Sequence, residues 1–509
     1  MKLNKLIIIL ILLLAVFLRF YRIDTDPPGL YIDEVSTGVN AYKILTTGQD
    51  EFGVPYPLFF RSFGDYKPPV YIYSVASVMS VLGKNELAIR FPSAAAGSLS
   101  ILLFYFFIKR LVELKSNKIQ PAIKKYLPAT GMLLLALSSW HIHFSRGGFE
   151  VNLALFFYLL GCYLLVLFWG NNKAKYFVGG FILFALSAYT YHTFRIISPL
   201  SWLILLTAFF IKLPKLRKKI IRCGVIFIIL IIPIIQFSLT SKGSERFVQT
   251  SAFSEYKADT TTQKLFVYPM VYVKNYISFF SFDYLFSNGD GNGRHQIPGF
   301  GLLYRWQLPF LILGTSWLIK QKRNAYKYVV IGLISLAPLP AALARPSPHS
   351  LRSLLLILPI TILISLGIVI FYINLKKFKK IFLVFLVIIA MYDFLIYAHF
   401  YYNHYPKVNA LDWGAGNKQI VEKIIKHKGK YDYLVIDKNL NFTEHYVNFY
   451  MDSVELLVVE SSWVKPKEWE KKKVLYIRPN YGNVNNEQII DRAYLPGNNN
   501  DIYAEIWNL

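Results

Sequence analysis

The sequence predicts a polytopic α-helical membrane protein of about 11 transmembrane helices, followed by a small extracytoplasmic α/β domain. Hydrophobic residues make up 54% of the 509 residues, more than a soluble chain of this length needs. Apolar runs of roughly 18–25 residues, long enough to cross a bilayer as helices, recur up to about residue 400. Beyond that point the composition turns polar, so we expect a membrane domain over 1–400 and a separate domain over 401–509.

The formal net charge of +26 is distributed as a membrane protein requires. Lysine and arginine gather in short loops between the apolar runs, at 109–125, 212–222, 320–327 and 376–380. Because cytoplasmic loops carry an excess of these residues, we expect all four to be cytoplasmic and to attract anionic lipid. This distribution argues against a nucleic-acid-binding surface. Cys162 and Cys223 lie in or beside apolar runs and offer neither a disulfide framework nor metal-ligand spacing.

The basic loops predict a cytoplasmic N-terminus and an extracytoplasmic C-terminus, with the plasma membrane of a prokaryote as the expected location. Arg19, Tyr21 and Arg22 stand where a signal peptide would have small residues, so the first apolar run is a retained helix. The eleven expected membrane helices cover residues 5–20, 88–108, 127–143, 151–169, 176–191, 196–211, 219–238, 304–319, 326–343, 353–373 and 380–400.

Two long outer loops follow from this topology, at 21–87 and 239–303. The apolar segment 68–83 opens with two prolines and is too short to span, so we expect an interfacial or re-entrant helix there. In the C-terminal region, residues 416–428 have helical apolar spacing, and short runs such as 431–436 and 474–477 are strand-like.

Three acidic residues on the expected outer side are candidates for chemistry. Asp33 and Glu34 follow the first membrane helix, and carboxylates beside lipid are costly to place. The alternative is that Asp33 is the N-cap of an interfacial helix and Glu34 complements its dipole. Glu150 begins the fourth membrane helix, where it is either a functional acid or an ordinary first-turn acid with Arg146 as its ion partner.

Several cations lie on the same side, where the charge rule predicts few. Lys67 precedes Pro68-Pro69, an ordinary helix start, and Arg90 lies four residues after Glu86, a spacing that favours a structural pair. The other cations lie at helix ends and are His192, Arg195, Arg294, His295, Arg345, His349 and Arg352. Such residues either reach the lipid headgroups or bind an anionic ligand such as a lipid phosphate.

The sequence lacks motifs that would bind a soluble donor such as a nucleotide sugar or ATP. Residues 289–293 (GDGNG) form a glycine-rich stretch without a phosphate-binding pattern, and we expect a flexible loop. No zinc spacing and no cytoplasmic nucleotide domain is found, so no residue is assigned to a metal. Because nucleotide sugars and ATP stay in the cytoplasm, an activated donor for an outer reaction has to arrive in the lipid.

Three motifs follow one another in the first outer loop: Asp33-Glu34, Lys67-Pro68-Pro69 and the ELAIRFPS run of residues 86–93. This loop resembles that of the polyprenyl-phosphate-sugar-dependent glycosyltransferases of the GT-C membrane fold. Protein O-mannosyltransferases and lipid A aminoarabinose transferases belong to that group. The resemblance is strongest over residues 1–200, and the hydropathy pattern continues it to about 400.

The resemblance implies an inverting transfer of a sugar from a polyprenyl-phosphate donor to a hydroxyl of protein, lipid or glycan. By its match, Asp33 is the general base, Glu34 positions the base or the acceptor, and Glu150 corresponds to the second-loop acid, which is often Asp in the family. The cations expected to bind substrate, of which Lys67 alone matches a motif, are Lys67, Arg90, His192, Arg195, His349 and Arg352. No cofactor is certain, and a requirement for a divalent ion stays open.

Other functions remain open at this point. A ligase or polymerase that moves a whole lipid-linked glycan would need a wide outer groove, which the loop 239–303 is long enough to supply. A lipid-linked sugar flippase or transporter would place charges near mid-membrane and often has repeated halves, whereas the charges here lie at helix ends. A structural or sensory protein would leave the acidic pair and the Lys-Pro-Pro motif unexplained.

Overall fold

The computed structural model describes the chain in two compact units. The first comprises residues 1–21, 57–74 and 90–397, and the second comprises 22–56, 75–89 and 398–509. The described residues are 2–114, 119–256, 260–322, 324–375, 377–440, 442–451, 456–461, 463–481, 488–496 and 501–509.

Helices cover all or part of each of the eleven expected membrane segments. They are α1 (Lys2–Phe20), α4 (Glu86–Glu113), α5 (Pro121–Leu137), α7 (Glu150–Asn171), α8 (Ala174–Ala188), α9 (Phe194–Lys212), α10 (Arg217–Ser238), α13 (Leu308–Lys320), α14 (Ala325–Leu336), α15 (Ile357–Asn374) and α16 (Lys379–Asn403). Among the described residues, seven helices are both long and apolar enough to cross a membrane, and α8 is a shorter apolar helix. The predicted polytopic helical fold is therefore confirmed.

One expected helix is interrupted. The apolar run at 127–143 predicted a single helix, but α5 ends at Leu137 and α6 (Ser139–Arg146) follows at once. Ser138 between them has an extended backbone, and its hydroxyl accepts a hydrogen bond from the backbone N–H of His141 at 3.3 Å. Serine is favoured at such N-caps because its hydroxyl oxygen accepts a hydrogen bond from a backbone N–H that has no partner within the helix. The hydropathy pattern does not detect this break because apolar residues continue through it.

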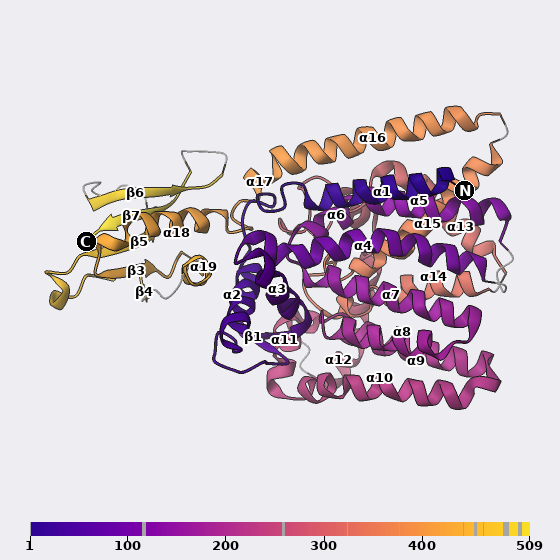
Figure 1. Ribbon diagram of the computed structural model, residues 1–509, viewed down its shortest axis with the longest axis horizontal. Coiled ribbons are helices and arrows are strands. Elements are labelled where there is room, and N and C mark those ends of the chain that lie inside the picture. The colour runs from indigo at the N-terminus through magenta and orange to yellow at the C-terminus, as the bar shows by residue number, and fades with distance from the viewer. Residues whose placement is uncertain are drawn as a thin grey trace. The chain divides into compact units, whose positions relative to one another are not determined.

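The helices of the first unit pack with nearly parallel axes, and α7, α8, α9 and α10 lie one beside the next (Figure 1). α15 packs against α5, α13 and α14 and is buried without interruption from Ile357 to Ile370. Its sequence is apolar on every face, as a helix enclosed by other helices requires.

α13 and α15 approach each other closely at two glycines. A Cβ atom at Gly314 would lie 1.9 Å from the carbonyl oxygen of Leu363, and one at Gly367 would lie 1.9 Å from that of Phe310. Small residues allow the backbones of membrane helices to meet in this way.

We expect Gly314→Ala to lower the thermal stability of the detergent-solubilised protein, because overpacking of a tight contact typically costs about 1–3 kcal/mol. Gly332→Ala is the matched control, since no atom lies within 4 Å of a Cβ at that helical position. The two variants would be compared by their midpoint temperatures of unfolding. Equal midpoints for Gly314→Ala and Gly332→Ala would show that the crossing tolerates a methyl group.

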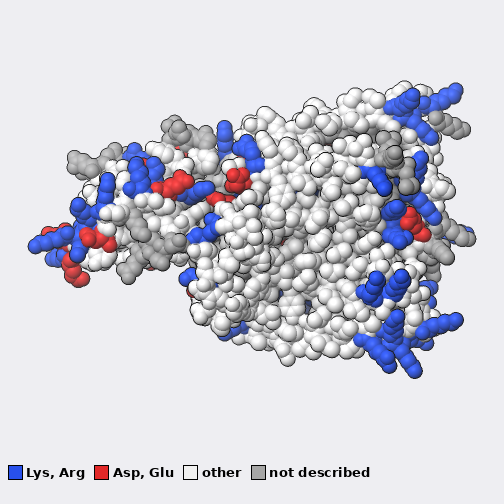
Figure 2. Space-filling view, viewed as in Figure 1, with Lys and Arg blue, Asp and Glu red and all other residues white. Residues whose placement is uncertain are grey.

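The charge pattern of the first unit agrees with a membrane-embedded body. Figure 2 shows Lys and Arg gathered at the end of the helices where α9 meets α10, while the surface along the middle of the helices is almost without charge. The N-terminus lies at that same end (Figure 1). Lys115, Lys118, Arg323 and Lys376, which belong to the predicted basic loops, lie outside the described residues.

Both predicted outer loops contain regular structure. The first carries α2 (Ile32–Thr47), a hairpin of β1 (Phe60–Ser62) and β2 (Asp65–Lys67), and α3 (Pro69–Leu82). With 14 residues, α3 is about 21 Å long, less than the ~30 Å of a bilayer core. The loop 239–303 contains α11 (Ser241–Thr250), α12 (Thr261–Ser278) and a π-helical turn, η3 (Asp283–Ser287).

The C-terminal residues form a mixed five-stranded sheet in the order β4-β3-β5-β7-β6, as the sequence predicted in outline. The strands are β3 (Tyr433–Asp437), β4 (Leu456–Val459), β5 (Val474–Pro479), β6 (Ile489–Tyr494) and β7 (Ile502–Asn508). β3 runs parallel to β4 and β5, whereas β7 is antiparallel to β5 and β6. Two helices accompany the sheet, α18 (Ala415–His427), expected at 416–428, and α19 (Thr443–Tyr450).

Candidate functional site

Asp33 and Glu34 lie in the first turn of α2, in the second unit, and have different surroundings. Glu34 is fully buried, and its Oε2 accepts a hydrogen bond from the backbone N–H of Tyr31 at 3.1 Å. Tyr31 is thus the N-cap residue, and the expectation that Asp33 could fill that role is wrong. Glu34 completes the helix start because its carboxylate satisfies an N–H that has no helical partner. Asp33 is half-buried beside it.

In the first unit, five basic side chains from four segments converge. We call the set the cation cluster: Lys67, His192, Arg195, Arg246 and Arg352. Burial, followed by repulsion from the other four members, lowers the pKa of His192 well below its usual value. Four of these residues were predicted from the sequence, and the fold brings them together although they are up to 285 positions apart. Such a set of donors and charges is suited to an anion with several oxygens, such as a phosphate.

The cluster is built on short, well-fixed elements. Lys67 ends β2 and is buried, and Arg195 lies in the first turn of α9 with its guanidinium 5.2 Å from the centre of the Phe59 ring. The backbone N–H of Val70 donates to the carbonyl of Tyr189 at 3.3 Å, which ties the segment after Lys67 to the turn that carries His192. The packed backbone of these segments therefore fixes the positions of Lys67, His192 and Arg195.

Arg246 was not predicted from the sequence. It lies in α11, within a loop that the sequence described only by its length, and no motif surrounds it. Its guanidinium forms an ion pair with Asp65, two residues before Lys67. A usable signal was its occurrence in the expected outer loop 239–303, where the charge rule predicts few cations.

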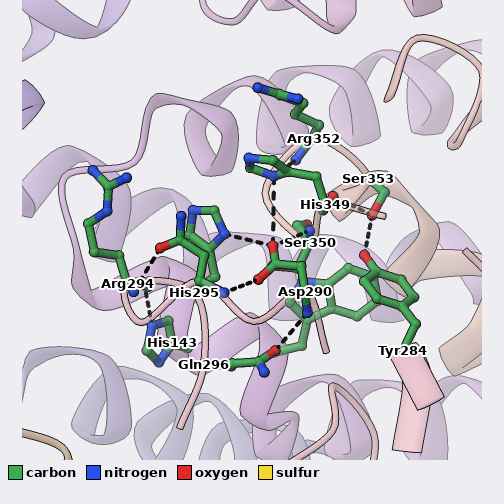
Figure 3. A network of polar contacts seen from close by, with 12 residues as sticks. His143, Tyr284, Asp290, Arg294, His295, Gln296, His349, Ser350, Arg352 and Ser353 are labelled. Atoms are coloured by element: carbon green, nitrogen blue, oxygen red, sulfur yellow. Dashed lines mark hydrogen bonds and ion pairs between the residues drawn. The ribbon is translucent and has the colours of Figure 1, made fainter. Parts of the chain in front are cut away.

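A second network, centred on Asp290, lies beside the cluster (Figure 3). Its Oδ2 accepts hydrogen bonds from His295 Nδ1 at 2.7 Å and from the backbone N–H and the hydroxyl of Ser350, both at 2.8 Å. His349 Nδ1 lies 3.8 Å from the same oxygen. Burial alone would raise the pKa of Asp290, but its hydrogen bond to His295, the charge of that histidine and the hydrogen bond from Ser350 lower it.

Asp290 therefore anchors the loop that carries Arg352. Ser350 lies between His349 and Arg352 in the chain, so the two bonds from Ser350 to Asp290 fix the backbone on either side of it. Arg352 is held further by a hydrogen bond to the carbonyl of Arg345 at 2.8 Å. Burial and the neighbouring charge of Arg352 lower the pKa of His349 well below its usual value, which favours its neutral form. The sequence predicted a flexible loop at 289–293, and that expectation is wrong for Asp290, whose side chain is only 1% exposed.

Asp290, His295 and His349 are also the described residues whose donor atoms could share a metal ion, since these atoms lie within 4.8 Å of one another. An ion there would have to displace the three hydrogen bonds on Oδ2. It would also experience the positive charges of Arg352 and Arg246, which act on His349. The geometry therefore favours a hydrogen-bonded anchor over a metal site.

Glu150 is the first residue of α7 and is half-buried, and Arg146 before it is fully buried. The guanidinium of Arg146 donates to the carbonyls of Leu18 and Tyr21 at 2.9 and 2.7 Å, at the end of α1. In return, the guanidinium of Arg19 on α1 donates to the carbonyls of Leu135 and Ala136, where α5 ends, at 3.4 and 3.3 Å. These paired arginines satisfy helix-terminal carbonyls that would otherwise lack donors.

Glu86, which was expected to pair with Arg90, has other partners. Glu86 takes Lys418 as its ion partner at 2.6 Å and accepts a hydrogen bond from the hydroxyl of Tyr450 at 2.8 Å. The structural pair expected between Glu86 and Arg90 is therefore replaced by partners from the C-terminal residues. Arg90 itself is fully buried in α4.

Comparison with known proteins was consistent with the motifs. Residues 66–237 match the family described as dolichyl-phosphate-mannose-protein mannosyltransferase. A comparison with curated protein sequences gives no match.

Two solved structures share the fold. ArnT from Cupriavidus metallidurans bound to undecaprenyl phosphate superposes with a TM-score of 0.61 at 11% identity, over 98% of this chain and 97% of that one. The oligosaccharyltransferase AglB from Archaeoglobus fulgidus, in complex with an inhibitory peptide and a dolichol-phosphate, gives a TM-score of 0.53 at 11% identity, over 87% of this chain and 63% of that one. The family match covers residues 66–237, and the chain as a whole is a multi-pass membrane protein that shares the fold of ArnT.

Proposed function

We propose that the chain transfers a single sugar from a polyprenyl-phosphate donor to a hydroxyl group at the outer face of the plasma membrane, with inversion at the anomeric carbon. The observation that carries this proposal is the convergence of Lys67, His192, Arg195, Arg246 and Arg352 in one cluster. The bond from the anomeric carbon to the phosphate oxygen breaks, and the phosphate leaves with the electron pair. Cations that meet this developing charge lower the barrier, because they are fixed before the reaction begins.

Asp33 is the general base in this reaction. It takes the proton of the acceptor hydroxyl while the acceptor oxygen forms its bond to the anomeric carbon. Proton transfer to a positioned carboxylate of this kind typically contributes ~10²–10⁴-fold to the rate. Glu34 is occupied by the backbone N–H of Tyr31, so we assign it to holding the helix start rather than to proton transfer. Glu150 remains a candidate for positioning the acceptor.

The proposal includes an orientation of the chain in the membrane. The N-terminus and the basic loops face the cytoplasm, and the cation cluster, Asp33 and the C-terminal residues lie outside. The donor then reaches the site within the membrane, which agrees with the lack of a nucleotide-binding motif in the sequence.

A transfer assay tests the proposal. Purified protein in lipid vesicles would receive radiolabelled polyprenyl-phosphate sugars one at a time, together with an extract of membranes and cell wall. We expect label to pass to an acceptor from at least one donor, with a mass gain of one sugar. A mass gain of many sugars would favour a ligase or polymerase, and labelled lipid crossing the bilayer without transfer would overturn the proposal in favour of a flippase.

A further inference from the structure

The C-terminal residues pack against the segment that carries Asp33, within the second unit. α19 contributes to this contact through Tyr446 and Phe449. The hydroxyl of Tyr446 donates to the carbonyl of Leu30 at 2.6 Å. A Cβ atom at Gly38 would lie 2.7 Å from Cε2 of Phe449 and 2.7 Å from Cδ1 of Ile89, so α2 meets α19 and Ile89 without room for a side chain.

A second contact lies on the N-terminal side of Asp33. A Cβ atom at Gly29 would lie 2.5 Å from the carbonyl oxygen of Trp413, and the ring of Tyr31 meets the Trp413 ring edge to face at 5.4 Å. Trp413 is itself fully buried, and its indole N–H donates to the hydroxyl of Tyr405 at 2.7 Å. The chain around Asp33 is therefore held four residues before it and five residues after it.

Fixation of this kind matters for a general base. A helix of 16 residues such as α2 is marginally stable without tertiary contacts. A displacement of about 1 Å at a reacting group can cost on the order of 10²-fold in rate. Phe449, Tyr446 and Trp413 touch the segment but lie too far along the chain to be motif neighbours of Asp33.

From these contacts we infer that the C-terminal domain is a positioning element for the catalytic base. Tyr446, Phe449 and Trp413 are its positioning residues, and they set the location of Asp33 through the backbone of residues 29–38. The inference rests on the proposed role of Asp33 as base. It assigns to the C-terminal domain a part in the reaction that its sequence, which carries no family motif, does not reveal.

The experiment disturbs this contact and then restores it. Gly38→Leu inserts a side chain against Phe449, and Phe449→Ala removes the obstructing ring from the other side. We expect Gly38→Leu to lower kcat at least about tenfold with an unchanged KM for the lipid-phosphate donor, and the double variant to regain part of the loss. Tyr446→Phe should lower kcat to a smaller extent, whereas the matched control Tyr433→Phe, on a tyrosine that stacks on Trp469, should not.

A readout independent of activity accompanies the kinetics. Amide hydrogen exchange over residues 30–47, measured by mass spectrometry on the full chain, should be faster in Gly38→Leu and in Tyr446→Phe than in the wild type. Full kcat in both Gly38→Leu and Tyr446→Phe would overturn the positioning role if Asp33→Asn is inactive. Activity in Asp33→Asn would instead reject the base itself, and unchanged exchange would reject the contact.

Discussion

Replacement of Asp33 by asparagine is expected to lower the rate of sugar transfer by about 10²–10⁴-fold, the usual contribution of a general base. Asparagine has nearly the same size but cannot accept the proton of the acceptor hydroxyl at neutral pH. Because the cation cluster is unchanged, the affinity for the lipid-phosphate donor should stay within about twofold of the wild type. The measurement is initial transfer rate against donor concentration for protein that is correctly inserted and monodisperse.

Glu34→Gln is the informative comparison, because the two acids are neighbours in the chain and differ in surroundings. Glu34 is fully buried and bonded to the backbone of Tyr31, and glutamine keeps an oxygen that can accept this hydrogen bond, so α2 should stay folded in the variant. Its effect on kcat should be smaller than that of Asp33→Asn. Turnover close to wild type in a well-folded Asp33→Asn protein would remove Asp33 from the mechanism.

Replacement of Asp290 by asparagine should destabilise the protein by at least about 1.5–3 kcal/mol, the worth of one hydrogen bond to a charged group. Three donors converge on Oδ2 of Asp290, two of them from Ser350, and an amide cannot accept them all as a carboxylate does. The change would be read as a lower midpoint temperature of unfolding. Asp283→Asn is the matched control, since Asp283 is exposed in the same loop and accepts a single bond from Asn288.

The pH dependence gives a second test of Asp290. Its pKa is lowered in the folded protein, so its contribution to stability is present at neutral pH. That contribution should be lost as the pH falls below about 4, where the unfolded carboxyl begins to bind protons. Asp290→Asn should show a weaker acid-induced loss of stability than the wild type. Identical acid profiles would show that the hydrogen bonds to Asp290 do not favour its ionised form.

The hydropathy pattern predicted the membrane helices well because an apolar run of sufficient length has few alternatives in a bilayer. It missed the break at Ser138, which depends on one hydroxyl rather than on hydrophobicity. The loop 239–303 was described only as long, although it forms α11 and α12, since their packing faces are supplied by distant segments. Local pattern therefore predicted the scaffold better than the structures between its helices.

The site was predicted in part for a related reason. Asp33 and Lys67 lie in short motifs that a reader can recognise, and His192, Arg195 and Arg352 stand out as cations at helix ends on the side that the charge rule predicts to be extracytoplasmic. Asp290 was missed because its partners His295 and Ser350 become significant only when two loops meet. Its neighbouring glycines suggested mobility, whereas they lie in a loop bonded to buried groups.

The cation cluster has a consequence for the stability of the folded protein. Five basic side chains from segments between 67 and 352 are brought together against their mutual repulsion, and Asp65 pairs with one of them. The folded protein is therefore frustrated at the cation cluster. A bound phosphate would relieve that repulsion, so the donor lipid should also act as a folding ligand and raise the stability of the protein in proportion to its occupancy.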